Sequence, residues 1–311
     1  MSLKDDPRAY QYIVDHLAPG TTISRHVEIT NNTPSPQEVQ LYAAAATIAG
    51  GSFLFGAGQA ANALTGWTTV SPPSVRLAPG TSSTATVTIA VPANADVGEQ
   101  YAVVWAQLAA AVPSGGGVTS VNRVGVRMYL SVGTGTAPVT QFSITALQAR
   151  RAADGSSLVV ATVNNTGGRA IDVSGSMLMT NGPGGLSAGP FSAQLGTTLG
   201  LGQVEPVEVP LSAAIPRGPW NAQMTLTSGA TTVTASATIT FPEAGATAAA
   251  PVKTASASHG SGQMPLIVGA GVLVLLLVLG AFGWARRRGR RRRAAVVESP
   301  EVAELVGPSV R

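Results

Sequence analysis

The chain has 311 residues, no cysteine and a formal net charge of +4. The charge is uneven, because residues 1–264 hold 11 Lys and Arg against 12 Asp and Glu, a net of −1. That balance excludes a basic face for nucleic acid, and the lack of cysteine excludes a disulfide framework. The 36 glycines and 21 prolines are typical of short strands joined by many turns, so we expect an all-β protein.

Alternating apolar and polar residues predict a first group of strands. The alternation is clear in residues 22–30, 84–91 and 123–132, and it also occurs around Trp105. We expect the apolar faces of these strands to meet in the core of a β-sandwich. The expected core face of the last strand consists of Val124, Val126, Met128, Leu130 and Val132.

A second group of strands follows in a similar order. Asn-Asn-Thr sequences at 31–33 and 164–166 start corresponding turns, and each is followed by an apolar strand pattern. The repeat predicts two tandem Ig-like β-sandwiches rather than one large sheet. The strands expected in the second sandwich are residues 158–163, 207–211, 220–227 and 232–241.

Residues 266–285, which begin at Leu266, carry no charge and precede a cluster of arginines. Twenty residues span about 30 Å as a helix, which matches the apolar thickness of a bilayer. Basic residues stay on the cytoplasmic side, so we expect a single-pass protein of the cell membrane with its N-terminal domains outside and its tail in the cytoplasm. The expected membrane and lipid contacts are Leu266, the interfacial Trp284, Arg286, Arg287 and Arg288.

The N-terminal residues contain no apolar run of the kind that a secretory signal needs. Since some 260 residues are expected outside the membrane, we expect that an upstream signal peptide is missing from the sequence; translocation by the C-terminal span alone is the alternative. The expected organisation is an N-terminal segment 1–9, a first sandwich 10–134, a second sandwich 138–241, a flexible Ala/Ser/Gly/Thr linker 242–264, a transmembrane helix 265–285 and a basic tail 286–311.

The turn and strand motifs of the first sandwich resemble the N-terminal domain of WxL-interacting surface proteins. The motifs are APGT at 18–21, LYAA at 41–44, a segment with Trp67, LAPG at 77–80 and the run VPANADVGEQYAVVWA at 91–106. A second Ig-like domain, a span and an arginine-rich tail complete the similarity, which covers roughly residues 10–293. The resemblance implies that the first domain contacts peptidoglycan and the second a partner surface protein.

Residues with catalytic or metal-binding chemistry are few. Ser187 lies in a G-x-S-x-G sequence, but no helix pattern follows it, and neither His16 nor His26 belongs to the same domain. The spacing of these histidines and of Asp5, Asp6 and Asp15 matches no metal site, so we interpret them as solvated surface residues. We therefore expect no enzyme, no metal and no cofactor, and a hydrolase using Ser187 is the weakest hypothesis.

Aromatic residues are the remaining candidates for binding. Trp105 and Trp220 lie in alternating strands and are expected in the cores. The long irregular segment 50–66 leads into Trp67, and ordered loops of that length commonly serve binding. Phe53, Phe55 and Trp67 are therefore the candidate ligand-binding residues, and packing of the loop on itself is the alternative.

Two functions remain open from the sequence. The first is a non-enzymatic, membrane-anchored, extracytoplasmic bacterial protein that binds cell-wall glycan (peptidoglycan), a surface protein, or both. The second is a cell-envelope assembly or chaperone-like factor that uses strand-edge pairing with a secreted client.

Overall fold

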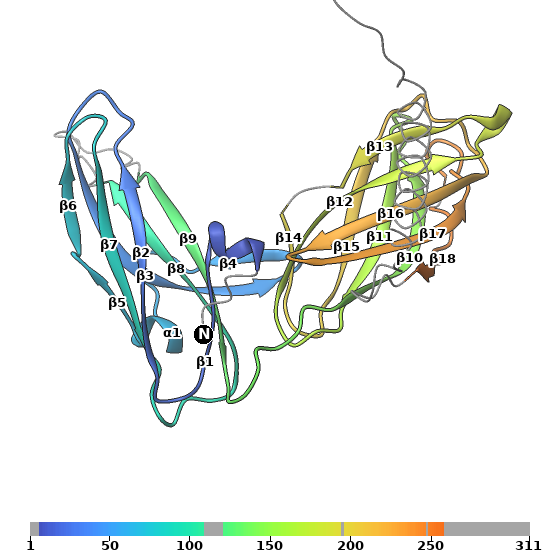
Figure 1. Ribbon diagram of the computed structural model, residues 1–311. Helices are drawn as coiled ribbons and strands as arrows, with labels where there is room; N and C mark the ends of the chain where they lie inside the picture. The colour runs from blue at the N-terminus through green and yellow to red at the C-terminus, as the bar shows by residue number, and fades with distance from the viewer. Residues whose placement is uncertain (1–5, 109–120, 194–195, 247, 258–311) are drawn as a thin grey trace, which may run out of the picture. The chain divides into compact units, whose positions relative to one another are not determined.

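The computed structural model describes residues 6–257, except 109–120, 194–195 and 247. The described chain is mostly β and forms two sandwiches, which confirms the expected all-β class and the two-sandwich architecture (Figure 1). The first sandwich comprises a short 3-10 helix Pro7–Tyr10, β1 Ile13–Leu17, β2 Thr22–Thr30, β3 Gln37–Ala49, β4 Ser52–Phe55, α1 Ala63–Gly66, β5 Thr68–Ser71, β6 Ser74–Leu77, β7 Ser82–Ala90, β8 Gly98–Leu108 and β9 Arg123–Val132.

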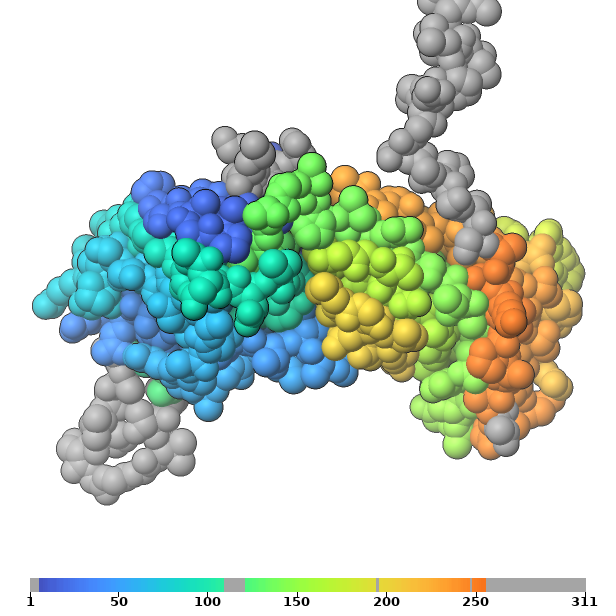
Figure 2. All heavy atoms as spheres, turned by 90° about the horizontal axis from the view of Figure 1, so that it is seen from below, coloured from blue at the N-terminus to red at the C-terminus, as the bar shows by residue number. Residues whose placement is uncertain are grey.

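Two sheets make up the first sandwich. One has the order β1-β9-β8-β3-β4 with β6 also on β3, and the other has the order β2-β7-β5. Strand β1 runs parallel to β9, and this pairing lays the N-terminal segment, dark blue in Figure 2, against the green β9. The inward faces of the two sheets meet around Val87 and Ile89 on one side and Met128 and Leu130 on the other. Burial of these alternating side chains is what holds the two sheets together.

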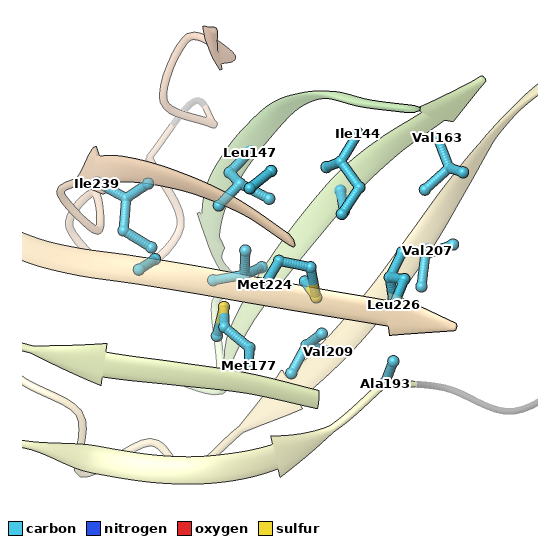
Figure 3. Close-up of a cluster of buried hydrophobic side chains, with 14 of the residues drawn as sticks. Ile144, Leu147, Val163, Met177, Ala193, Val207, Val209, Met224, Leu226 and Ile239 are labelled. Carbon is cyan, nitrogen blue, oxygen red and sulfur yellow. The ribbon is translucent and has the colours of Figure 1, made fainter. Parts of the chain in front are cut away.

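The second sandwich has a larger continuous core. Its sheets have the orders β15-β11-β10-β18 and β13-β12-β16-β17-β19, with β14 also on β12. Figure 3 shows Ile144 and Leu147 from one sheet pointing toward Met177 and Met224 from the other. The strands are β10 Phe142–Arg151, β11 Ser157–Asn165, β12 Ile171–Thr180, β13 Ala188–Ser192, β14 Thr197–Leu199, β15 Val204–Leu211, β16 Trp220–Ser228, β17 Thr231–Ile239, β18 Val252–Lys253 and β19 Ala255–Ala257, with a 3-10 turn Pro183–Gly185.

Trp220 shows how the second core closes. Its ring is fully buried, and its indole N–H donates to the Pro216 carbonyl over 2.9 Å, so the polar atom is satisfied. The ring lies against Gly182, where a Cβ atom would approach it to 2.2 Å, and only glycine fits there. Trp105 is buried as well, as the alternating pattern predicted.

Buried polar groups join the two sandwiches. The backbone of Ala170, just before β12, donates its N–H to Glu99 over 2.5 Å and accepts from Arg8 over 2.8 Å. Asp6 pairs with Arg169 over 2.7 Å and also with Arg8. These partners come from elements about 70 to 160 residues apart in the chain, so the junction forms only when both sandwiches are folded.

Two expectations are corrected here. Asp6, Asp15 and His16, interpreted as solvated, are buried; Asp6 pairs with Arg8 and Arg169, and Asp15 pairs with Arg25. Within the stretch expected as a flexible linker, β18 pairs with β10 and β19 pairs with β17.

Candidate functional site

One edge of strand β9 is unpaired along the first half of the strand, among the described residues. Strand β8 pairs along the whole of β9, but β1 pairs only with Met128 to Val132 on the opposite side. Among the described residues, no strand pairs with that side of residues 123–127. An open strand edge presents unpaired backbone N–H and C=O groups, which is the template that a further strand needs.

The hydrogen-bond pattern shows which backbone groups are open. Leu108 donates its N–H to the Asn122 carbonyl over 3.0 Å, so the polar groups of residue 122 point toward β8. In an antiparallel ladder this direction alternates, and the register of β8 with β9 has no bulge. The N–H and C=O groups of Arg123 and Gly125 therefore point to the open edge.

Three other edge strands are less suited to pairing. Strand β15 carries Pro206 and Pro210, and β13 carries Pro190, which remove backbone donors from those edges. The edge strand β2 places Arg25 toward the sandwich interior and Glu28 on its other face. Residues 123–127 contain no proline, so the edge of β9 keeps every donor.

Two hollows lie beside this edge, between β9 and β2. The first has a volume of about 430 Å³ and includes Val124, whose side chain is 73% exposed. The second has a volume of about 310 Å³ and is lined by Val126, the β2 residues 25–28 and residues 9–14 of the N-terminal segment. The lining of the first hollow that faces the core consists of Ile29, Val39, Leu77, Ala106, Leu108 and Val124.

The opposite face of the edge carries an aromatic platform. Trp105 lies directly across from Gly125 in the ladder, and a Cβ atom at 125 would be 2.6 Å from the indole ring. Glycine is therefore required for the ring to cover the edge. The guanidinium carbon of Arg123 lies 4.2 Å from the centroid of the same ring. The ring of Phe55 makes an edge-to-face contact with the indole, with 5.0 Å between the ring centroids.

The sequence-predicted residues are only partly brought together. Phe53 and Phe55 lie 5.4 Å apart, but Phe53 is buried whereas Phe55 is 43% exposed. Trp67 packs half-buried against the core cluster around Val87 and Ile89, and no ring contact joins it to either phenylalanine among the described residues. The binding role of the three residues stays a prediction. Ser187 is exposed in the turn before β13.

The part of β9 that pairs with β1 lies next to the polar contacts between the two sandwiches. Arg127 donates to Asp172 over 3.2 Å and lies over the ring of Phe53 at 4.8 Å. Burial raises the pKa of the nearby Glu99 carboxyl above its usual range, despite the hydrogen bond from Tyr101. Burial acts in the same direction on Asp6, but the hydrogen bonds and charge of Arg8 outweigh it and lower the pKa of that carboxyl.

Sequence reasoning missed the open edge. Val124 belongs to the same alternating face as Met128, and both were expected in the core, yet Met128 is fully buried and Val124 is exposed. The difference arises because β1 ends its pairing at Met128. One sequence signal was present: Gly125 lies inside a strand of alternating residues, and a glycine there indicates close approach of another group.

Comparison with known proteins gives structural matches alone. No family model matches the chain, and no curated protein matches its sequence. The CupB2 chaperone of Pseudomonas aeruginosa is similar at 10% identity and a TM-score of 0.41, covering 73% of this chain and 97% of that one. The YadV chaperone is similar at 12% identity and a TM-score of 0.41, covering 74% and 96%. The CsuC–CsuE chaperone–tip adhesion subunit complex of Acinetobacter baumannii matches at 15% identity and a TM-score of 0.38, covering 74% and 96%.

The expected family is corrected by these findings. The resemblance to WxL-interacting surface proteins is wrong, since no family model matches the chain. Contacts with peptidoglycan, which that resemblance implied, are not retained.

The expected localisation is corrected as well. Within the part of the chain that the structure describes, no helix is long and apolar enough to cross a membrane. The single-pass cell-membrane protein and its lipid contacts, expected from the sequence, are not retained as conclusions. The residues assigned to the anchor, Leu266, Trp284, Arg286, Arg287 and Arg288, lie outside the described residues.

Proposed function

We propose that the chain is a non-enzymatic, chaperone-like factor of cell-envelope assembly that pairs the open edge of β9 with an extended segment of a surface-protein client. The observation that carries this proposal is the unpaired stretch 123–127, flanked by two hollows and free of proline. The proposal is the second of the two functions that the sequence left open. The similar chaperone–tip adhesion subunit complex and a Salmonella enterica chaperone in complex with the SafA pilin are in keeping with it.

The edge supplies both affinity and orientation. Each backbone hydrogen bond contributes about 0.5–1.5 kcal/mol net, so pairing at Arg123 and Gly125 is weak by itself. The apolar lining around Val124 adds burial of client side chains, at roughly 25 cal/mol per Å² of apolar surface. A client strand held this way has its own exposed edge covered until assembly, which is the task of a chaperone for β-rich subunits.

A single backbone change tests the proposal. Arg123→Pro removes an N–H that points to the open edge and leaves the ladder with β8 intact, whereas Arg123→Ala removes the same side chain and keeps the N–H. A photo-reactive benzophenone side chain at position 124 of the full chain should crosslink an extended segment of a secreted surface protein. We expect the adduct to persist with Arg123→Ala and to be lost with Arg123→Pro. Equal adduct from both variants contradicts pairing at this edge.

A further inference from the structure

We propose that the two hollows between β9 and β2 select the client strand by two of its side chains. One is a large apolar residue beside Val124, and the other is an uncharged polar residue two positions away beside Val126. The inference rests on the proposed function, because a strand must first pair with the open edge. It adds the chemical class of the segment that this edge accepts.

Strand geometry links the two hollows. Val124 and Val126 are two residues apart on one face of β9, which corresponds to about 6.6–6.8 Å along the strand. Each valine belongs to a different hollow, and β2 forms the opposite wall of both, through Ile29 and Thr30 at the first and residues 25–28 at the second. A paired client strand therefore directs two successive same-face side chains into the two hollows.

The first hollow has apolar chemistry. Its inner surface is continuous with the core cluster of Ile29, Val39 and Leu77, and Ala106 and Leu108 pack on the same cluster. Val124 is exposed there although it lies on the inward face of the strand. A leucine, isoleucine or phenylalanine of the client would cover Val124 and complete that cluster.

The second hollow has a mixed lining, in which Arg25 is the charged donor. Its wall includes Arg25, which bonds Asp15 through Nε over 3.1 Å and through Nη2, and bonds the Ser24 carbonyl through Nη1 over 2.9 Å. Three of the five guanidinium N–H groups are used in these bonds, so two remain to donate to a client oxygen. A client carboxylate would approach the buried Asp15, and an apolar side chain would leave the Arg25 donors without an acceptor. A serine, threonine or asparagine fits both conditions.

The absence of cysteine in the chain allows a direct measurement. Asn32 is exposed at the rim of the first hollow, so Asn32→Cys in the full chain gives a single thiol for disulfide tethering. The probes are synthetic nine-residue peptides with a cysteine at either end, threonine on the outward face, and Leu/Ser, Ser/Leu, Leu/Leu or Ser/Ser as the inward pair. The fraction of each peptide retained under mild reductant reports its local affinity.

We expect one mixed order, Leu/Ser or Ser/Leu, to be retained at least about tenfold better than Leu/Leu and Ser/Ser. Val124→Arg should abolish that preference by filling the first hollow with charge. Val97→Arg is the matched control, because Val97 is 79% exposed in the same sandwich but lines neither hollow, and it should change nothing.

The two proposals fail in distinguishable ways. Equal retention of all four pairs, lost in the Arg123→Pro background, overturns the two-residue selection and leaves pairing at the edge intact. Best retention of Leu/Leu also overturns the selection. Retention that Arg123→Pro does not change overturns the proposed function together with the selection.

Discussion

Truncation of Phe53 and Phe55 separates a structural from a binding role. The two rings touch, but Phe53 is 5% exposed and Phe55 is 43% exposed. Phe53 packs against Tyr129 at 5.2 Å and Tyr101 at 6.2 Å, beneath the guanidinium of Arg127. Its replacement by alanine leaves a cavity beside Ala170 at the junction of the two sandwiches.

The expected losses in the free energy of unfolding are clearly different for Phe53→Ala and Phe55→Ala. Phe→Ala in a packed site costs about 3–5 kcal/mol, and Phe53→Ala should fall in that range. Phe55 has one ring contact besides Phe53, with Trp105, so Phe55→Ala should cost at most about 1.5 kcal/mol. Urea denaturation of the two single variants and of the parent protein measures both losses.

Crosslinking from position 124 provides the second measurement on the same variants. Phe55→Ala should reduce client capture because the ring borders the Trp105 platform, whereas the folded fraction of Phe53→Ala should capture the client normally. Losses below about 1 kcal/mol for both variants, with capture lost in Phe53→Ala alone, would refute this reasoning and assign Phe53 to the binding surface.

Three further predictions concern the edge, the junction and the domain boundary. Gly125→Ala should lower the free energy of unfolding by about 1–3 kcal/mol, because the added methyl group meets the ring of Trp105; an unchanged urea midpoint contradicts that packing. Because the pKa of Glu99 is raised in the folded state, this carboxyl keeps its proton at pH values above the ordinary pKa of 4.5. Its contribution to the free energy of unfolding is therefore complete below pH 4.5 and is lost as the pH rises through the folded-state pKa. Glu99→Gln should remove that part of the pH dependence of unfolding, and a variant whose pH profile is identical to that of the parent protein contradicts the prediction. We propose that residues 10–134 and 138–241 each express as a β-rich unit that melts cooperatively, and an unfolded half beside a stable full chain contradicts the boundary.

Alternation in the sequence was sufficient to predict several strands. The expected strand 22–30 coincides with β2, and the expected strand 84–91 overlaps β7 at residues 84–90. Both lie in an antiparallel sheet with one buried and one solvated face, where the period of two is strongest. In the second sandwich, the expected strands 207–211 and 220–227 fall within β15 and β16 for the same reason.

The junction and the open edge depended on contacts that local patterns do not encode. Asp6 and Arg8 precede β1 in a segment with no regular pattern, and they are buried because Arg169 reaches them from the other sandwich. Val124 is exposed because β1 pairs with β9 only from Met128 onward, a contact between residues more than a hundred positions apart. The strand pattern itself is the same on both sides of that point.

Amide hydrogen exchange along β9 tests the central claim most directly. In the free protein, the N–H groups of Arg123 and Gly125 should exchange rapidly, while those of Val124 and Val126, which point toward β8, should be protected. Binding of the client identified by crosslinking should protect Arg123 and Gly125 and leave Val124 and Val126 unchanged. Protection of Arg123 and Gly125 already in the free protein, or no change when the client binds, would contradict strand pairing at this edge.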